Sequence, residues 1–199
     1  SAMFVPGGLK VVDMNKDGKL DNNDRTDLGN PYPDFNWGIT NTFKFKGIDF
    51  SFLFQGVQGG KLINGDPNYN ESRRTIRIYN QNRWISPMYP GDSKTPYSTN
   101  GFNWMLTDYV IEDASYFALR EVNLGYTLPA SAIKRFNINS LRVYFSAQNL
   151  YFQTAAGYRG INPEGRFSNG PYSSVLIDGY QRGSFPIPQT ITAGIDINF

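Results

Sequence analysis

The ten residues Thr190-Ile191-Thr192-Ala193-Gly194-Ile195-Asp196-Ile197-Asn198-Phe199 decide how the rest of the chain is interpreted. Side chains of a β-strand point alternately to its two faces. One face of this stretch is therefore entirely apolar and ends on an aromatic ring, whereas the other face carries Thr, Gly, Asp and Asn. Strands that span a membrane have this pattern over about 9–11 residues, apolar toward lipid and polar toward the lumen. A half-buried strand of a soluble domain alternates in the same way, so this stretch alone leaves both classes open.

The composition favours strands and turns and excludes several kinds of chemistry. The 199 residues include 13 Tyr and 15 Phe together with 20 Gly and 12 Pro, a mixture typical of β-rich chains. The chain has no Cys and no His, which removes disulfides, thiol chemistry, His-dependent catalytic triads and His-ligated zinc. The net charge of +2 is not concentrated in a Lys/Arg run, so we expect no nucleic-acid partner.

Five segments alternate between apolar and polar side chains, and we expect each of them to be a strand. They are residues 36–46, 48–57, 109–128, 140–152 and 189–199. In the third segment, Phe117 and Leu119 have the opposite parity to Val122 and Leu124. A β-bulge near Arg120-Glu121 would return all four side chains to one face, because one extra residue inverts the register.

The connections between these segments alternate strictly between short and long. Lys46-Gly47 and residues 129–136 form short turns, whereas residues 58–108 and 153–188 form long loops without a clear period. Irregular loops of this length are uncommon inside compact soluble domains. They are natural on the extracellular side of a membrane barrel, whose periplasmic side has short turns. Five strands cannot close such a barrel, since the smallest have about eight, so we expect the chain to be part of a larger one.

The N-terminal region contains a calcium-like turn. Residues 1–3 are typical of a cloning scar, and we expect residues 4–35 to form an extracellular loop. A twelve-residue segment within it has oxygen-bearing side chains at positions one, three, five, nine and twelve, with Gly at position six, as calcium loops do. The candidate Ca²⁺ ligands are Asp13, Asn15, Asp17, Lys19 through its carbonyl, Asp21 and Asp24. Helices that normally flank such a loop are not expected here, and a solvated Asp/Asn turn without an ion is the alternative.

Aromatic side chains in the first long loop are candidates for stacking on sugar rings. They are Trp84, Tyr89, Tyr97 and Trp104, and each of them could equally pack the loop against itself. A soluble carbohydrate-binding β-sandwich with a structural calcium is therefore an alternative, although sandwich strands are separated by turns every ~8–12 residues. A glycosidase with Glu112 and Glu164 as its carboxylate pair is another alternative, but nothing in the sequence sets their separation. We expect the chain not to be an enzyme.

Short motifs along nearly the whole chain resemble one family. They are Asp13-Met14-Asn15-Lys16-Asp17-Gly18-Lys19-Leu20-Asp21, Gly29-Asn30-Pro31-Tyr32-Pro33-Asp34-Phe35, Phe54-Gln55-Gly56-Val57-Gln58-Gly59, Glu112-Asp113-Ala114-Ser115-Tyr116, Asn123-Leu124-Gly125-Tyr126-Thr127-Leu128-Pro129, Gln148-Asn149-Leu150 and Asn162-Pro163-Glu164. In this order they resemble the C-terminal part of SusC/RagA-type TonB-linked outer membrane proteins of Bacteroidetes.

The resemblance implies an all-β fold, with antiparallel strands from the C-terminal part of a roughly 22-stranded transmembrane β-barrel and long extracellular loops. It also implies a location in the cell outer membrane, in contact with the lipid bilayer. The full-length protein would import glycans or peptides together with a SusD-like surface lipoprotein, using energy from TonB. The plug and the TonB-contacting segment would lie outside this chain, and the sequence does not name the substrate.

Overall fold

The computed structural model describes residues 6–65, 82–97, 107–165, 179–181 and 184–199. The chain forms two compact units. The strand unit comprises Pro33–Gly59, Ala114–Ala156 and Pro186–Phe199, and the loop unit comprises Ser1–Tyr32, Gly60–Asp113 and Gly157–Phe185. Among the described residues, no helix has both the length and the apolar character needed to cross a membrane.

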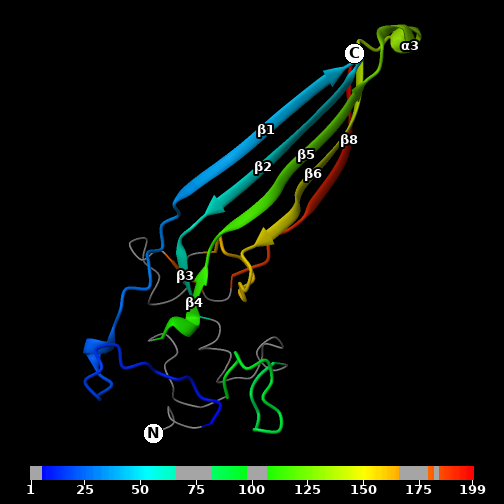
Figure 1. Ribbon diagram of the computed structural model, residues 1–199. Helices are drawn as coiled ribbons and strands as arrows, with labels where there is room; N and C mark the ends of the chain where they lie inside the picture. Colours follow the sequence, from blue (N-terminus) through cyan, green and yellow to red (C-terminus); the bar gives the residue numbers. More distant parts are fainter. Residues whose placement is uncertain (1–5, 66–81, 98–106, 166–178, 182–183) are drawn as a thin grey trace. The chain divides into compact units, whose positions relative to one another are not determined.

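The strand unit is a single antiparallel sheet of five strands in the order β1-β2-β5-β6-β8 (Figure 1). The strands are β1 (Phe35–Phe45), β2 (Ile48–Gln58), β5 (Tyr116–Thr127), β6 (Ser140–Thr154) and β8 (Thr190–Asn198). Each strand pairs with its neighbour over almost its whole length, in the up-and-down order of the chain. The expected all-β, antiparallel fold is confirmed, and the sheet is open, with β1 and β8 at its edges.

Both short connections lie at one end of the sheet (Figure 1). β1 and β2 are joined by Lys46 and Gly47, whose φ angles of 46° and 84° have the sign that a type I′ hairpin turn requires. β5 and β6 are joined through α3 (Ala130–Ile133) and η4 (Lys134–Phe136), which ends at Asn137 in a left-handed conformation. A Cβ on Gly47 would lie 2.6 Å from the carbonyl oxygen of Thr127, so this position requires glycine for space as well as for φ.

The bulge expected near Arg120-Glu121 is confirmed. Leu53 and Phe54 of β2 pair with Glu121 and Leu119 of β5, so Arg120 is the extra residue between the two pairs. The insertion places the side chains of Phe117 and Leu119 on the same face as those of Val122 and Leu124, as the change of parity in the sequence predicted.

The loop unit contains a small three-stranded sheet in the order β4-β3-β7, together with the short helices η1 (Asn22–Asp24) and η3 (Asp108–Val110). Its strands are β3 (Lys61–Asn64), β4 (Ile111–Asp113) and β7 (Tyr180–Gln181). β3 and β7 fall within the segments expected to be long loops. With four and two residues, they are too short to produce a visible alternation. The segment 109–128, expected to be one strand, is divided by the buried pair Ala114-Ser115.

Candidate functional site: a sheet with one apolar and one polar face

One face of the five-stranded sheet is apolar at most positions, with Asn41 and Gln153 as polar exceptions. The pairing aligns Phe43 with Phe50, Phe50 with Leu124, Leu124 with Phe145, and Phe145 with Ala193, so one such row crosses all five strands. Aromatic rings contact one another along β2, with centroids 5.8 Å apart for Phe50 and Phe52. We call this surface the apolar face; its members are Trp37, Ile39, Phe43, Phe45, Ile48, Phe50, Phe52, Phe54, Phe117, Leu119, Val122, Leu124, Tyr126, Leu141, Val143, Phe145, Tyr151, Ile191, Ala193, Ile195 and Ile197.

The apolar face is exposed rather than packed into a core. Ile191, Ile195 and Ile197 are 65%, 62% and 48% exposed, and Phe43 is 55% exposed. Five strands about 4.8 Å apart, each with roughly nine paired residues at 3.3 Å, make a surface on the order of 600 Å². Soluble monomers rarely expose a contiguous apolar patch larger than a few hundred Å². The exposure expected for the terminal isoleucines in a lipid-facing strand is therefore observed.

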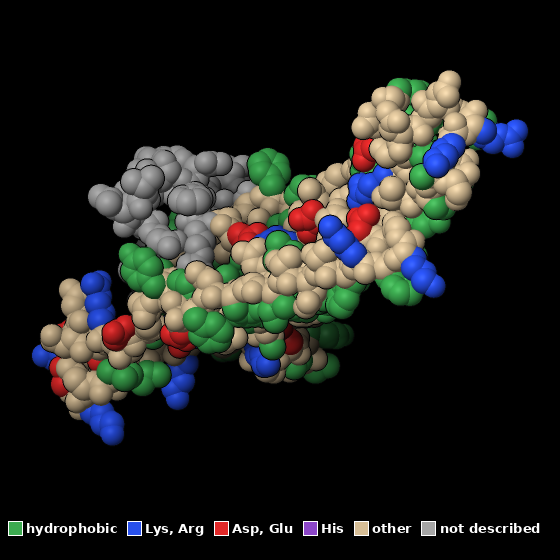
Figure 2. Space-filling model, turned by 90° about the horizontal axis from the view of Figure 1, so that it is seen from above, with side chains coloured by type: hydrophobic (Ala, Val, Ile, Leu, Met, Phe, Trp, Pro, Cys, Tyr) green, Lys and Arg blue, Asp and Glu red, His purple; other side chains and the backbone are tan. Residues whose placement is uncertain are grey.

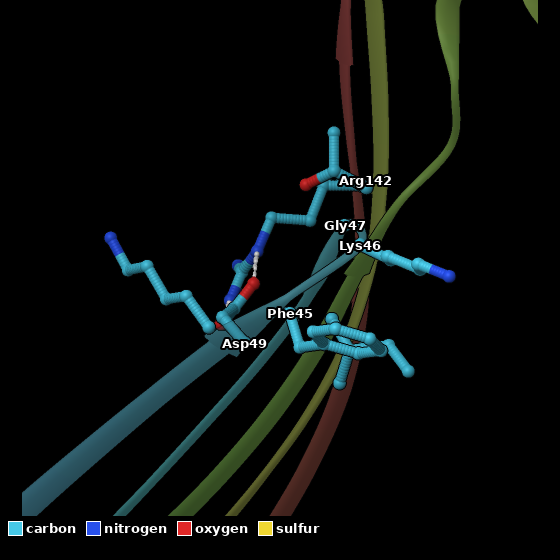
Figure 3. A pocket seen from close by; sticks show the side chains of 8 residues that line it. Phe45, Lys46, Gly47, Asp49 and Arg142 are labelled. Carbon is cyan, nitrogen blue, oxygen red and sulfur yellow. Dashed lines mark hydrogen bonds and ion pairs between the residues drawn. The ribbon is translucent and has the colours of Figure 1, made fainter.

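The opposite face is polar and carries an ion pair that spans three strands. Arg142 of β6 donates hydrogen bonds to both carboxylate oxygens of Asp49 on β2, at 3.1 and 2.6 Å (Figure 3). It also lies 3.5 Å from the carboxylate of Asp196 on β8. A Cβ on Gly125 of the intervening β5 would lie 2.3 Å from Arg142 Nη2 and 2.5 Å from Asp49 Oδ1. Gly125 therefore leaves the space through which the arginine crosses β5.

A second polar network surrounds the bulge. Arg120 donates from Nε to Oε1 of Gln55 at 2.9 Å and from Nη1 to Oδ1 of Asn149 at 3.1 Å. Asn149 has a left-handed φ of 52°, and its amide donates to the carbonyl of Pro188 at 2.9 Å. The extra residue in β5 thus ties together β2, β6 and the segment before β8. The alternation of apolar residues in the sequence predicted the bulge but not these partners.

The predicted calcium loop folds as a turn in which the acidic side chains bind main-chain N–H groups. Asp13 accepts from Gly18, and Asp24 accepts from Met14 and Asp21, each at 2.8 Å. The hydrogen bond from the Asp21 N–H is the main cause that lowers the pKa of Asp24 below its ordinary value. The same kind of bond occupies the remaining side-chain candidates, Asn15, Asp17 and Asp21. No group of three or more acidic side chains within the described residues is placed to hold a metal ion, and calcium binding stays a prediction.

Two of the three aromatic candidates in the described part of the chain contact each other. Trp84 and Tyr97 pack edge-on with centroids 6.2 Å apart, and a Cβ on Gly7 would lie 2.2 Å from the indole. The contacts of Trp84 favour the interpretation that it packs the loop against itself. Tyr89 is 67% exposed at the end of a turn. Trp104 lies outside the described residues.

A buried ion pair holds the loop unit together. Glu112 is 6% exposed and accepts hydrogen bonds from Nδ2 of Asn64 at 3.0 Å and from the backbone N and Nε of Arg159 at 3.0 and 2.7 Å. The Arg159 guanidinium lies 4.4 Å from the ring centroid of Tyr109 and also donates to the Tyr109 carbonyl. These bonds use both carboxylate oxygens of Glu112, so they favour a structural role over the glycosidase alternative with Glu164.

Comparison with known proteins gives relatives along nearly the whole chain, although no family model matches it. TonB-dependent receptor P26 of Formosa agariphila is 32% identical over 98% of this chain, and TonB-dependent receptor P3 of the same bacterium is 29% identical over 98%. TonB-dependent receptor SusC of Bacteroides thetaiotaomicron is 21% identical over 94% of this chain. The chain spans only about a fifth of the length of these relatives.

A solved structure of the RagAB peptide transporter shares the fold. Its TM-score is 0.64 at 21% identity, and the match covers 91% of this chain and 19% of that chain. Sequence and fold comparisons therefore point to the same kind of protein, each over more than nine-tenths of this chain. Over nearly its whole length the chain is similar to TonB-dependent receptors of the SusC/RagA type, which are outer-membrane proteins of Bacteroidetes.

Proposed function

We propose that the chain forms part of the wall of an outer-membrane transporter, with its apolar face toward lipid and its polar face toward a water-filled interior. The observation that carries this proposal is the exposed apolar face, continuous over five strands and backed by the polar face. At about 25 cal/mol per Å², leaving half of roughly 600 Å² in water costs on the order of 8 kcal/mol. Contact with lipid tails removes that cost.

The edges of the sheet support the same interpretation. β1 and β8 each have one neighbour among the described strands. A sheet that spans a bilayer has to close, because lipid offers no partner for the hydrogen-bonding groups of an edge strand. In the full-length protein we expect further strands at both edges, since this chain spans only about a fifth of its relatives.

The arrangement of the connections supports an orientation. The short turns would face the periplasm, and the long connections, which join the opposite ends of the strands along the chain, would face outward. The full-length protein would import glycans or peptides with a SusD-like lipoprotein, with TonB supplying energy. The RagAB structure that shares the fold is that of a peptide transporter, which supports the peptide alternative.

A soluble carbohydrate-binding sandwich fits the structure poorly. Two sheets of a sandwich bury their inner faces against each other. Here Ile39, Phe43 and Phe145 are 52%, 55% and 41% exposed at positions that would form such a core.

Spin labels on neighbouring residues test the assignment of the two faces. The chain contains no Cys, so Ile195→Cys and Asp196→Cys can each carry one label in a cysteine-free, full-length protein in lipid bilayers. We expect oxygen, which concentrates in lipid, to relax the label at residue 195 more strongly than a water-soluble nickel complex does, and the reverse at residue 196. Equal accessibility of both labels to both reagents would refute the lipid–lumen assignment.

A further inference from the structure

Positive side chains gather at the end of the strand unit that carries the short turns (Figure 2). Lys46 lies in the β1–β2 turn, and Lys134 and Arg135 lie in the β5–β6 connection. Beside them are the rings of Phe45 and Phe136, which are 70% and 63% exposed. We call these five residues the basic turn cluster. It combines free positive charge with exposed aromatic surface at the border of the apolar face.

Two of the cations lie over the exposed rings. Nζ of Lys46 is 5.2 Å from the ring centroid of Phe45, and the guanidinium carbon of Arg135 is 5.5 Å from that of Phe136. Both distances are within the range of a cation–π interaction. Such a contact holds the cation beside an apolar surface and leaves its N–H donors available to another acceptor.

The described residues supply no acidic partner for these cations. Residues 45–48 and 128–139 contain no Asp or Glu. The side-chain carboxylates closest in the register, those of Asp49 and Asp196, lie on the polar face and bind Arg142. Figure 3 shows the side chain of Lys46 extending away from the Asp49–Arg142 pair. No ion pair of Lys46, Lys134 or Arg135 occurs in the described part of the chain.

The turn geometry does not explain the lysine. Lys46 has a φ of 46° at a turn position where Asn or Gly is preferred, because a left-handed backbone strains most other side chains. The backbone of this turn therefore does not select a lysine.

We propose that the basic turn cluster binds the phosphate group of an anionic lipid at the membrane surface next to the short turns. Aromatic rings concentrate at the headgroup level of a bilayer, where Phe45 and Phe136 would lie if the apolar face contacts lipid. Clusters of Lys and Arg at that level attract anionic headgroups, and a guanidinium can bind a phosphate through two parallel N–H donors. The inference rests on the proposed function, because a lipid-facing sheet is what brings these turns to the headgroups.

Lipid retention by the full-length protein tests the proposal. The protein is reconstituted in phosphatidylcholine bilayers that contain phosphatidylglycerol, extracted in detergent, and its bound lipid is measured by native mass spectrometry. The test variant is Lys46→Asn with Lys134→Gln and Arg135→Gln. Each lost cation is expected to weaken phosphatidylglycerol retention about fivefold, and the three together roughly a hundredfold. The substitutions should not change the retention of phosphatidylcholine. Added inorganic phosphate should not change the retention of phosphatidylglycerol by the unchanged protein.

The chain offers a matched control in the loop unit. Lys16 is also an exposed lysine at a left-handed φ of 62°, and Lys19 and Arg25 are exposed nearby. The variant Lys16→Asn with Lys19→Gln and Arg25→Gln should retain phosphatidylglycerol like the unchanged protein. Lys46→Asn alone suits the turn better than lysine, so its expected fivefold loss cannot come from misfolding.

The outcomes separate this inference from the proposed function. Wild-type retention in the test variant, or an equal loss in the control variant, overturns the lipid site and leaves the barrel wall intact. If inorganic phosphate displaces phosphatidylglycerol as well as added free phosphatidylglycerol does, the cluster binds phosphate in general, and a lipid headgroup is not its specific occupant. A protein that fails to insert into bilayers at all overturns both.

Discussion

Replacing the buried carboxylate of the loop unit should loosen that unit by a predictable amount. Asn64 and Arg159 both donate hydrogen bonds to the carboxylate of Glu112. Glu112→Gln keeps one acceptor oxygen but replaces the other with an NH₂ group, which cannot accept a hydrogen bond from these donors. Removing one partner of a buried ion pair costs roughly 3–5 kcal/mol. Arg159 is 23% exposed and keeps its contacts with Tyr109, so we expect the lower end of that range, about 3 kcal/mol.

Hydrogen exchange in the full-length protein measures this loss locally. The amides of Ile63 and Gly65 donate to carbonyls of Gly179 and Gln181, so they report whether β3 and β7 stay paired. A loss of about 3 kcal/mol in the opening free energy should speed their exchange roughly 150-fold. Amides in the centre of β5, in the strand unit, should exchange at an unchanged rate.

A double-mutant cycle checks the cause. Arg159→Gln removes the charge that Glu112 neutralises, so the double variant Glu112→Gln with Arg159→Gln should lose less than the sum of the two single losses. An effect below about fivefold in Glu112→Gln, or additive losses in the cycle, would show that the ion pair does not hold the loop unit together.

Three further predictions concern the polar face and the Asp-rich turn. Gly125→Ala should separate the ion pair that crosses β5 and lower stability by about 1–3 kcal/mol, measured as a lower melting temperature, whereas Gly38→Ala, whose Cβ would have an ordinary 3.7 Å contact, should have little effect. Hydrogen bonds lower the pKa of Asp24, so its turn should stay ordered at pH values above 3.8, the ordinary pKa of an aspartate, and should lose its order as the pH falls through the lowered pKa. NMR signals of the amides that donate to Asp24 should follow this loss of order. The variant Asp24→Asn should abolish the pH dependence. We propose that the same turn binds Ca²⁺. Millimolar calcium should then raise the melting temperature of the protein, a chelator should reverse the increase, and Asp13→Asn should remove it. A melting temperature that responds to neither calcium nor chelator would show that the turn binds no ion.

The strands and their faces could be predicted because alternation is a local property. The segments expected at 36–46, 48–57 and 140–152 are observed at Phe35–Phe45, Ile48–Gln58 and Ser140–Thr154. The bulge at Arg120 could also be predicted from the sequence, because one extra residue shifts the apolar side chains from odd-numbered to even-numbered positions.

The polar contacts could not be predicted, because they depend on register between segments far apart in the chain. Arg142 and Asp49 are separated by 93 residues, and their contact requires both the strand order and a glycine at the crossing point. Glu112 and Arg159 are 47 residues apart and lie in segments without any period. A carboxylate and an arginine in such segments give no signal that distinguishes a structural pair from a catalytic one.

The distribution of side-chain volume gives a separate reason to expect the sheet to curve toward its polar face. On that face, Gly125 lies beneath the crossing arginine, and a Cβ on Gly194 would lie 2.4 Å from the ring of Tyr144. Small residues under long side chains shorten the polar surface; the opposite surface has one such position, Gly56 beneath Trp37, but also large rings at Phe50 and Phe52. A closed barrel needs a smaller circumference inside than outside. The polar face is therefore suited to be the inner one on grounds of volume, independently of the exposure of the apolar face.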